Sequence, residues 1–457
     1  MSLPLFGKPR ATKVVVLGGG YVTIHGYKSL EKKLGKRMRD GSVEVTVVCP
    51  RSYHVFHGWT GEFFGGIVDL PNKHSDLRTV MPHARHVCGE AVSVDLQKRT
   101  VKVRVVGGGV EEELPYHHLL IGTGSYDAMD AVPGLEEHGL PLKGVGEVLA
   151  VRNRLLTNLE AADAVSDPRL QQRYLTIVIA GGGFAGVEMC AAMAELVDAL
   201  KERYPVLRKR RPRVVLVHSG EGLLPQWRPR FDKLADYATE QLYGWGVDVR
   251  LGTRLERVTE EGALLSDGEL VPAALVLSTV GMKLKVMPGT EQLPRAQDGR
   301  LMADEFNRVK GEANVWAGGD AAHLIHPRTR LPCPANALWA IKHGEWVGHN
   351  IGATILGKTM KPFTYPGLGQ VASLGIGKGA TELYGVQLTG WLAWISRFSF
   401  FMWFMPDPVN SVRVVMDWLM LPLAGRRAIP LFDGAPGARR ATAAHPPAHL
   451  RAVGASE

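Results

Sequence analysis

Two glycine triplets carry the clearest chemical signal in this chain of 457 residues. Gly18, Gly19 and Gly20 follow an apolar run at residues 13–17, and Gly181 to Gly183 follow another at residues 176–180. Each triplet is typical of a strand, a tight turn and a helix N-terminus, where backbone N–H groups and the positive end of the helix dipole bind a pyrophosphate. The two turns therefore predict two dinucleotide sites.

The elements that must position these turns follow them in the same order. Two equivalent sets of helix, strand and buried strand are expected, at 27–38, 43–48 and 119–121 after the first turn and at 187–203, 214–217 and 274–281 after the second. The first set ends in Gly122, Thr123 and Gly124, and the second ends in Gly281. This order predicts an α/β fold with two Rossmann-like dinucleotide-binding domains.

The chain is expected to return to the first domain at residues 314–317, a strand that ends in Gly318, Gly319 and Asp320. The second domain is then nested in the first. The predicted boundaries are 1–150 with 295–360 for the first domain, 151–294 for the second, 361–433 for a C-terminal helical region that associates with a membrane or forms a dimer, and 434–457 for a tail of disordered composition.

The composition and charge of the chain limit the kinds of partner that it could bind. The formal net charge is +9, and basic residues cluster at 209–211 and 426–427, which suits nucleic acid or an anionic membrane surface. No nucleic-acid motif is found, so we expect the membrane and no nucleic acid. The four cysteines, Cys49, Cys88, Cys190 and Cys333, have no CxxC spacing, so neither a zinc site, a disulfide framework nor a dithiol relay is indicated. Pairs of histidines have no carboxylate or cysteine cluster beside them, and no metal is predicted.

The C-terminal region holds the segments 391–405 and 412–423, which are apolar and rich in tryptophan, with Arg397 and Arg413 between the aromatic residues. They are shorter than the roughly 18 to 20 apolar residues of a spanning helix. This pattern predicts a helix pair lying at the membrane interface, with a core or homodimer hairpin as the alternative. The chain start lacks a secretory leader, so we expect a peripheral protein on the cytoplasmic face of the cell membrane.

Together these motifs resemble the two-dinucleotide flavoprotein superfamily, and within it the type II NADH dehydrogenases, which are FAD-containing NADH:quinone oxidoreductases. The resemblance covers nearly the whole chain before the tail. The residues that carry it are the two glycine turns, the segment Tyr53-His54-Val55-Phe56, Gly122-Thr123-Gly124, the run from Gly181 to Glu188, Gly318-Gly319-Asp320 and the Trp-rich C-terminal segment.

The resemblance implies two bound cofactors and names their sites. FAD would lie at the first turn, and NADH or NADPH at the second. The residues implied for FAD are Gly18, Gly19, Gly20, Tyr21, Cys49, Gly122, Thr123, Gly124, Gly319, Asp320 and Ala337, and those for the nicotinamide cofactor are Gly181, Gly183, Phe184, Gly186, His218 and Gly281. Hydride would pass from NAD(P)H to FAD, and two electrons then to a lipid quinone of a respiratory chain. Glu188 would face the reacting rings, and Lys378 would stabilise negative charge on the flavin.

Several positions depart from the family pattern, among them Lys342 and His343, which differ from the usual Gln-Gln or Gln-Glu. Thr23 replaces the third glycine of the first turn, which predicts a wider gap between helix and strand. Cys49 and His218 stand where acids normally bind the ribose hydroxyls, so NADPH is as compatible as NADH. Leu338 stands where the family has a glutamine at the quinone site.

Several alternatives remain open at this point. Asp320 could be a helix N-cap, Glu188 a helix-start glutamate that complements the dipole, and Lys378 a solvated loop lysine. Instead of an NAD(P)H:quinone oxidoreductase, the chain could be a sulfide:quinone or other small-acceptor flavoprotein, or a redox-inactive nucleotide-binding scaffold. A homodimer is left open.

Overall fold

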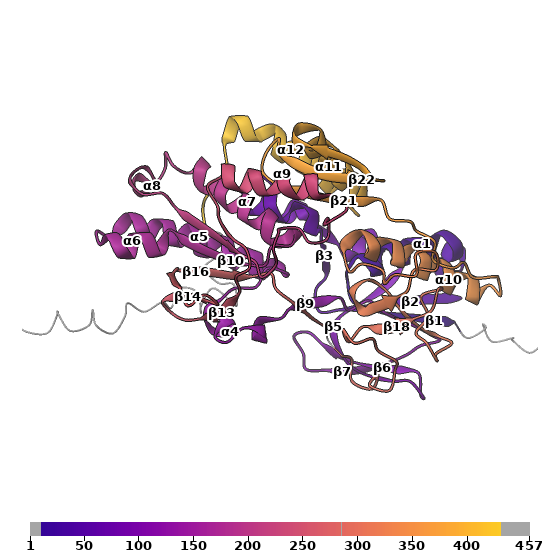
Figure 1. Ribbon diagram of the computed structural model, residues 1–457. Helices are drawn as coiled ribbons and strands as arrows, with labels where there is room; N and C mark the ends of the chain where they lie inside the picture. Colours follow the sequence, from indigo (N-terminus) through magenta and orange to yellow (C-terminus); the bar gives the residue numbers. More distant parts are fainter. Residues whose placement is uncertain (1–10, 285, 431–457) are drawn as a thin grey trace, which may run out of the picture.

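The computed structural model describes residues 11–284 and 286–430. The tail predicted at 434–457 lies outside the described residues. Two separate sheets, each built around a set of parallel strands, lie beneath a C-terminal layer of strands and helices (Figure 1).

The first sheet has seven strands in the order β19-β8-β1-β2-β5-β6-β7. Its strands are β1 (Thr12–Leu17), β2 (Val43–Cys49), β5 (Ala84–Asp95), β6 (Thr100–Val105), β7 (Glu111–Pro115), β8 (His118–Ile121) and β19 (Val315–Ala317). β19 to β5 pair in parallel, and β6 and β7 extend the sheet in antiparallel fashion. Helices α1 (Tyr21–Arg39) and α10 (Ala337–Ile355) pack together on it. The chain therefore returns to the first sheet after residue 315.

The second sheet repeats this arrangement with four parallel strands in the order β12-β11-β10-β16. They are β10 (Thr176–Ala180), β11 (Arg213–Val217), β12 (Asp248–Arg250) and β16 (Leu275–Ser278), with α5 (Val145–Ala164), α7 (Phe184–Ala199) and α9 (Asp232–Gly244) packed around them. A small antiparallel sheet, β13 (Leu255–Val258), β14 (Gly262–Leu265) and β15 (Leu270–Pro272), adjoins it. Each glycine turn thus follows a strand flanked on both sides by parallel partners.

Both turn-proximal helices begin earlier than their apolar periodicity predicts. α1 starts at Tyr21 rather than 27, and α7 starts at Phe184 rather than 187 and ends at Ala199. Gly20 and Gly183 are the N-cap residues, and neither offers a side chain to the cap. The first turn of α1 is buried from Tyr21 to Ile24, so it lacks the one-sided apolar stripe by which a surface helix is found, and at the start of α7 Ala185 is exposed.

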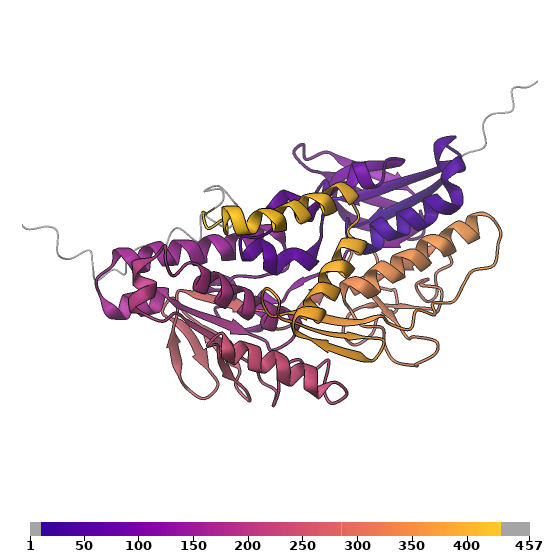
Figure 2. The same ribbon diagram turned by 90° about the horizontal axis from the view of Figure 1, so that it is seen from above.

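The C-terminal layer consists of an antiparallel sheet and two helices that lie across the junction of the two domains (Figure 2). Its elements are β21 (Gly369–Ser373), β22 (Gly379–Leu383), β23 (Val386–Thr389), α11 (Gly390–Phe404) and α12 (Pro408–Ala424). Beneath them lie a 3-10 turn (His57–Trp59), α2 (Thr60–Phe64) and the short pair β3 (Tyr53–Val55) and β4 (His74–Asp76). Within the described residues, every helix falls short of the length and apolarity that crossing a bilayer requires.

Candidate functional site

The first glycine turn forms an open cradle at the carboxyl end of β1. The N–H of Gly18 donates to the carbonyl of Val48 at 2.8 Å, and a Cβ on Gly18 would lie 2.3 Å from the carbonyl oxygen of Gly122. A Cβ on Gly20, by contrast, would have no atom within 4 Å. The turn is therefore closed against the sheet and open in front of the helix N-terminus, which fits a pyrophosphate.

A cavity of about 720 Å³ extends from this cradle. Its lining includes every residue that the resemblance implies for FAD, namely Gly18, Gly19, Gly20, Tyr21, Cys49, Gly122, Thr123, Gly124, Gly319, Asp320 and Ala337. Residues from the chain start, from the middle and from 318–340 thus meet in one elongated space. Their arrangement fits an extended dinucleotide whose pyrophosphate lies at the turn.

Asp320 lines this cavity and does not cap a helix. It belongs to a short 3-10 turn, and α10 is capped instead by the side chain of Asn336. Its carboxylate accepts hydrogen bonds from the Ser125 hydroxyl at 2.6 Å and the Lys143 ammonium at 3.1 Å. Burial raises the pKa of Asp320, but Lys143 and Ser125 outweigh burial and hold the pKa below its usual value. The N-cap alternative is therefore wrong, and the group is an ionised acceptor.

Thr23 and Cys49 occupy the positions that depart from the family pattern. The Thr23 hydroxyl donates to the carbonyl of Gly18 at 2.8 Å, so the side chain closes the gap between helix and turn. At the second turn a Cβ on Gly186 would lie 1.8 Å from the carbonyl oxygen of Gly181. Helix and turn therefore lie closer together there than at the first turn, where Thr23 faces Gly18. A Cβ on Gly19 would lie 2.7 Å from the Cys49 sulfur, so Cys49 packs beneath the first turn.

The second turn repeats the geometry of the first. Gly181 has φ of +111°, against +108° for Gly18, and its N–H donates to Val217 at 2.8 Å. His218, at the end of β11, accepts a hydrogen bond from the N–H of Gly182 through Nδ1 at 3.2 Å. Burial lowers the pKa of His218, so the ring is neutral at this turn. No carboxylate repels a 2′-phosphate from this position.

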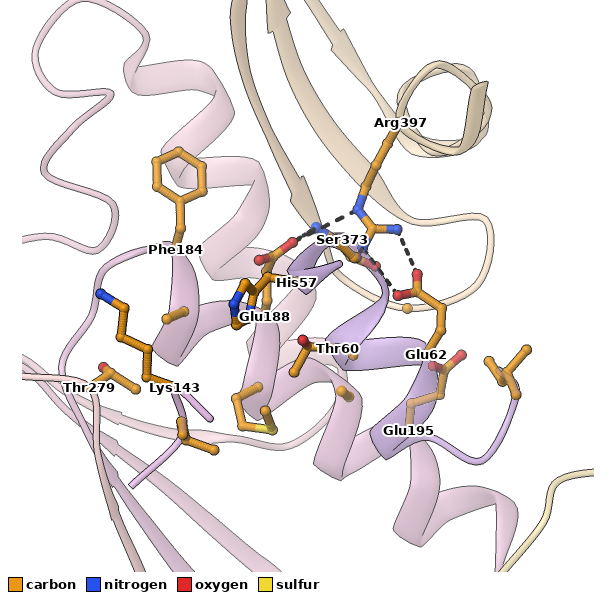
Figure 3. Close-up of a pocket in the computed structure, with 18 of the residues that line it drawn as sticks. His57, Thr60, Glu62, Lys143, Phe184, Glu188, Glu195, Thr279, Ser373 and Arg397 are labelled. Atoms are coloured by element: carbon orange, nitrogen blue, oxygen red, sulfur yellow. Dashed lines mark hydrogen bonds and ion pairs between the residues drawn. The ribbon is translucent and has the colours of Figure 1, made fainter. Parts of the chain in front are cut away.

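A second cavity, of about 620 Å³ and called here the joining cavity, meets the first cavity and reaches the start of α7 beside the second turn (Figure 3). From the second domain it is lined by Phe184, Glu188, Thr279 and Gly281, and from the C-terminal layer by Ser373, Trp394, Arg397 and Trp418. Four residues line both cavities: His57, Asp127, Lys143 and Ala335. The two spaces therefore meet where His57 and Lys143 lie.

Glu188 is held at the wall of this joining cavity. Its Oε1 accepts a hydrogen bond from the N–H of Ser373 at 2.8 Å and lies 3.9 Å from Nε of Arg397 (Figure 3). Burial raises the pKa of Glu188 and outweighs both the charge of Arg397 and the Ser373 N–H. Glu188 therefore lies at the cavity wall with a carboxyl group whose pKa is raised.

The structure does not bring Lys378 to either cavity. Its ammonium lies over the ring of Trp245, 4.1 Å from the ring centre, while the cavity lining from the same loop is Gly375 and Ile376. A cation–π contact of this kind accounts for the lysine without a cofactor. Leu338 likewise packs against the core of the first domain.

Several cavity residues escaped the sequence analysis. His57 follows the aromatic segment 53–56 that was singled out, so only its position offered a signal, and Lys143 and Glu62 offered none. Arg397 was expected at a membrane interface, but its side chain is 3% exposed and ion-paired. Trp394 and Trp418 also turn toward the cavity, whereas Trp391 and Trp403 are exposed. Among the residues the structure describes, no cluster of three or more His, Cys, Asp and Glu side chains could hold a metal.

Comparison with known proteins gives a consistent result. The family model described as pyridine nucleotide-disulphide oxidoreductase matches residues 12–344. The chain is 24% identical over 442 residues to the type II NADH:quinone oxidoreductase Ndh of Mycobacterium tuberculosis, covering 93% of this chain and 91% of that protein. It is 26% identical to the internal alternative NAD(P)H-ubiquinone oxidoreductase A1 of Solanum tuberosum, with coverage of 92% and 87%. In fold it is similar to NDH2 from Plasmodium falciparum in complex with NADH, with a TM-score of 0.83, 15% identity and coverage of 92% and 100%.

Proposed function

Because the chain belongs to the pyridine nucleotide-disulphide oxidoreductase family, we propose that it is an FAD-dependent enzyme that oxidises NADH or NADPH and reduces a quinone. The observation that carries this proposal is the joining cavity. It meets the cavity of the first turn at four shared residues, reaches the start of α7 beside the second turn at Phe184, and is also lined by residues of the C-terminal layer. A single reaction centre can therefore be reached from the nucleotide site and from the C-terminal side.

The residues present fit FAD at the first site. Gly18, Gly20 and the N-terminus of α1 would bind the pyrophosphate, and Asp320 would accept hydrogen bonds near the ribityl chain. When bound, the flavin would supply two-electron chemistry between the nicotinamide and the quinone. Lys143 holds Asp320 ionised, and His57 lines the space where the two cavities meet.

The second site fits either nicotinamide cofactor. Gly181, Gly183 and the N-terminus of α7 would bind its pyrophosphate, with Phe184 and Thr279 along the path to the joining cavity. His218 in place of an acid leaves room for NADPH as well as NADH. Glu188 would orient the nicotinamide and assist the proton balance of the reaction.

The exposed side chains of the C-terminal layer support a peripheral membrane location, which we propose is at the cytoplasmic face of the cell membrane. Large apolar side chains on α11 and α12 are exposed, namely Trp391, Leu392, Ile395, Trp403, Val409, Val412, Met416, Leu419, Met420 and Leu423. An exposed apolar helix face on a chain of net charge +9 suits an anionic bilayer, from which a lipid quinone could enter. The alternative is that a second copy of the chain covers this face in a homodimer.

The alternative of a sulfide oxidoreductase finds less support. All four cysteines are described and free, and none of them lines the joining cavity. Cys190 and Cys333 are buried in the cores of the two domains. A sulfide-oxidising set would need sulfur atoms beside the flavin.

Steady-state assays with soluble quinone test the proposal. The purified, flavin-loaded protein should oxidise NADH, NADPH or both only when a quinone is present, with sulfide inactive as a donor. If sulfide drives quinone reduction, then sulfide is the electron donor in place of NADH or NADPH. Absence of all of these activities in a flavin-loaded protein would favour a redox-inactive scaffold.

A further inference from the structure

Helix α11 inserts a charged side chain into the wall of the joining cavity (Figure 3). Arg397 is 3% exposed, and both of its terminal nitrogens bind Glu62 on α2, whose side chain is 5% exposed. The distances are 2.6 Å from Nη1 to Oε1 and 3.2 Å from Nη2 to Oε2, and Nη2 also donates to the carbonyl of Gly58 at 2.9 Å. This is a bidentate pair shielded from bulk water, the geometry in which arginine binds a carboxylate most firmly.

The third nitrogen of the same guanidinium is left without a partner. Nε of Arg397 is buried and makes no hydrogen bond, and it lies 3.9 Å from Oε1 of Glu188. Glu188 accepts instead from the backbone N–H of Ser373. One cation therefore stands between two carboxylates, bonded to Glu62 and outside hydrogen-bonding distance of Glu188.

We propose that Glu62 and Arg397 are positioning residues: by engaging the guanidinium in a bidentate pair, Glu62 keeps Arg397 from fixing Glu188 as a carboxylate, so that Glu188 can carry a proton to the acceptor. This inference rests on the proposed function. Reduction of a quinone to a quinol takes up two electrons and two protons, and NAD(P)H supplies two electrons and one proton as hydride. Glu188 would give the second proton to a quinone oxygen, become a carboxylate, and recover a proton from water in the cavity.

The charges around Glu188 single out Glu62 as the tuning group. Glu62 approaches from α2 and Arg397 from α11, and the pKa of Glu188 is raised by burial and by Glu62 while Arg397 lowers it. The other charged groups of the cavity have their own partners: Lys143 pairs with Asp320 at 3.1 Å, and Glu195 pairs with Arg426 at 3.1 Å. His57 and Asp127 line the cavity where it meets the first site, and the Asp127 carboxylate accepts from the N–H groups of Leu142 and Lys143.

Glu62→Gln tests the proposal. Without the Glu62 charge, Arg397 has Glu188 as its nearest counter-ion, and a cation within about 4–6 Å lowers a carboxyl pKa by roughly one to three units. A step that needs protonated Glu188 proceeds below its pKa and is lost above it. The alkaline limb of the rate of quinone reduction should therefore move to lower pH by about one unit or more.

A second readout does not depend on turnover. The infrared band of the protonated Glu188 carboxyl, assigned by its loss in Glu188→Gln, should titrate at lower pH in Glu62→Gln. Glu195→Gln is the matched control, because it neutralises a carboxylate on the same helix and cavity wall that is bound to a different arginine. The limb and the band should stay at their wild-type pH in that control.

Arg397→Gln should move both the alkaline limb and the infrared band to higher pH. This shift in the opposite direction tests the proposal even if Glu62→Gln fails to fold. An unchanged limb and band in Glu62→Gln, or an equal shift in Glu195→Gln, would overturn the proposal. A wild-type protein that reduces no quinone would contradict the proposed function instead. The infrared titration would still report whether Glu62 changes the pKa of Glu188.

Discussion

Asp320 and Lys143 form an ion pair in the lining of the first cavity. The Asp320 side chain is 18% exposed, and Ser125 and Lys143 supply its two side-chain hydrogen bonds. In this protein the carboxylate is thus oriented before any ligand arrives. Removing its charge would leave the Lys143 ammonium without its acid partner beside the cavity.

Asp320→Asn should therefore purify with less FAD than the wild type. The substitution removes an ionised acceptor and leaves Lys143 without its partner. Together these two effects should weaken FAD binding by about tenfold or more. The flavin-to-protein ratio after gel filtration measures this. Asp130→Asn breaks the exposed Asp130–Lys283 pair and should keep its flavin; equal flavin loss in both variants would contradict the role of Asp320.

At this scale the sequence predicts some site residues and misses others for a clear reason. Glu188 stands next to the second turn, so its place follows from the motif. Glu62 and Arg397 are 335 positions apart and meet only because α11 folds back over α2. Neither has a local pattern, and an arginine among tryptophans has the same sequence signature at a membrane interface as in a buried ion pair.

At the scale of elements, the two strand-turn-helix units are equivalent in backbone and differ in their space. Gly20 and Gly183 are both N-caps with extended backbone, at φ of −85° and −80°. A Cβ on Gly20 would meet nothing, and one on Gly183 would lie 3.4 Å from Nε2 of Gln226. Alanine at either position is compatible with the fold, but it would occupy the space where a pyrophosphate approaches the backbone.

Gly20→Ala and Gly183→Ala should separate the two cofactors. Gly20→Ala should lose FAD with little change in the unfolding temperature of the apoprotein. Gly183→Ala should keep FAD, and its dissociation constant for NADH or NADPH should rise by about tenfold or more. Flavin content, nucleotide titration and thermal melts measure these outcomes. Loss of FAD in Gly183→Ala with intact nucleotide binding would reverse the assignment of the two turns.

The helix pair α11 and α12 contributes to both the cavity and the surface. Arg397, Trp394 and Trp418 line the cavity, so deletion of the whole pair would damage the site as well as any membrane contact. Single exposed residues are therefore the better probes. Leu392, Leu419 and Leu423 are 67%, 61% and 82% exposed.

Serine at these three leucines should release the protein from anionic lipid vesicles. Each leucine that enters the lipid contributes roughly 1.5–3 kcal/mol to membrane binding. Replacing all three should therefore weaken vesicle binding by more than about a hundredfold in sedimentation assays. Val110→Ser, which alters a residue 62% exposed on the distant β6–β7 loop, is the control. Unchanged vesicle binding with loss of a dimer would assign this face to a second copy of the chain.

At the scale of the whole molecule, acid should destabilise the fold through buried neutral histidines. Burial lowers the pKa of His54 to about 4 and that of His343 to about 3, and both side chains are nearly inaccessible. Between those values and the unfolded pKa near 6.5, the unfolded chain binds protons that the folded chain does not. Each histidine should thus cost about 1.4 kcal/mol of stability per pH unit as the pH falls through this range.

His343→Gln, whose side-chain oxygen can still accept from the N–H of Gly319, should reduce this dependence. Its unfolding temperature should fall less than that of the wild type between pH 6.5 and 4.5. An equally steep or steeper fall would show that His343 is not among the groups that take up protons on unfolding.

The architecture of the molecule is predictable in outline because repeated patterns encode it. The two glycine turns and the apolar strands before them predict two parallel sheets, and the strand expected at 314–317 predicts the return to the first. How the C-terminal layer closes over both domains depends on packing between distant segments, such as Phe401 against Phe56 and Trp59. Such contacts leave no periodic trace in the sequence.

We propose that one flavin links the nucleotide site to a quinone through the joining cavity. Anaerobic absorbance spectroscopy of the purified protein tests it most directly. NADH or NADPH should bleach the oxidised flavin, and a soluble quinone added afterwards should restore the yellow colour with two-electron stoichiometry. A bound flavin that neither nucleotide bleaches, or a bleached flavin that quinone fails to reoxidise, would contradict the account.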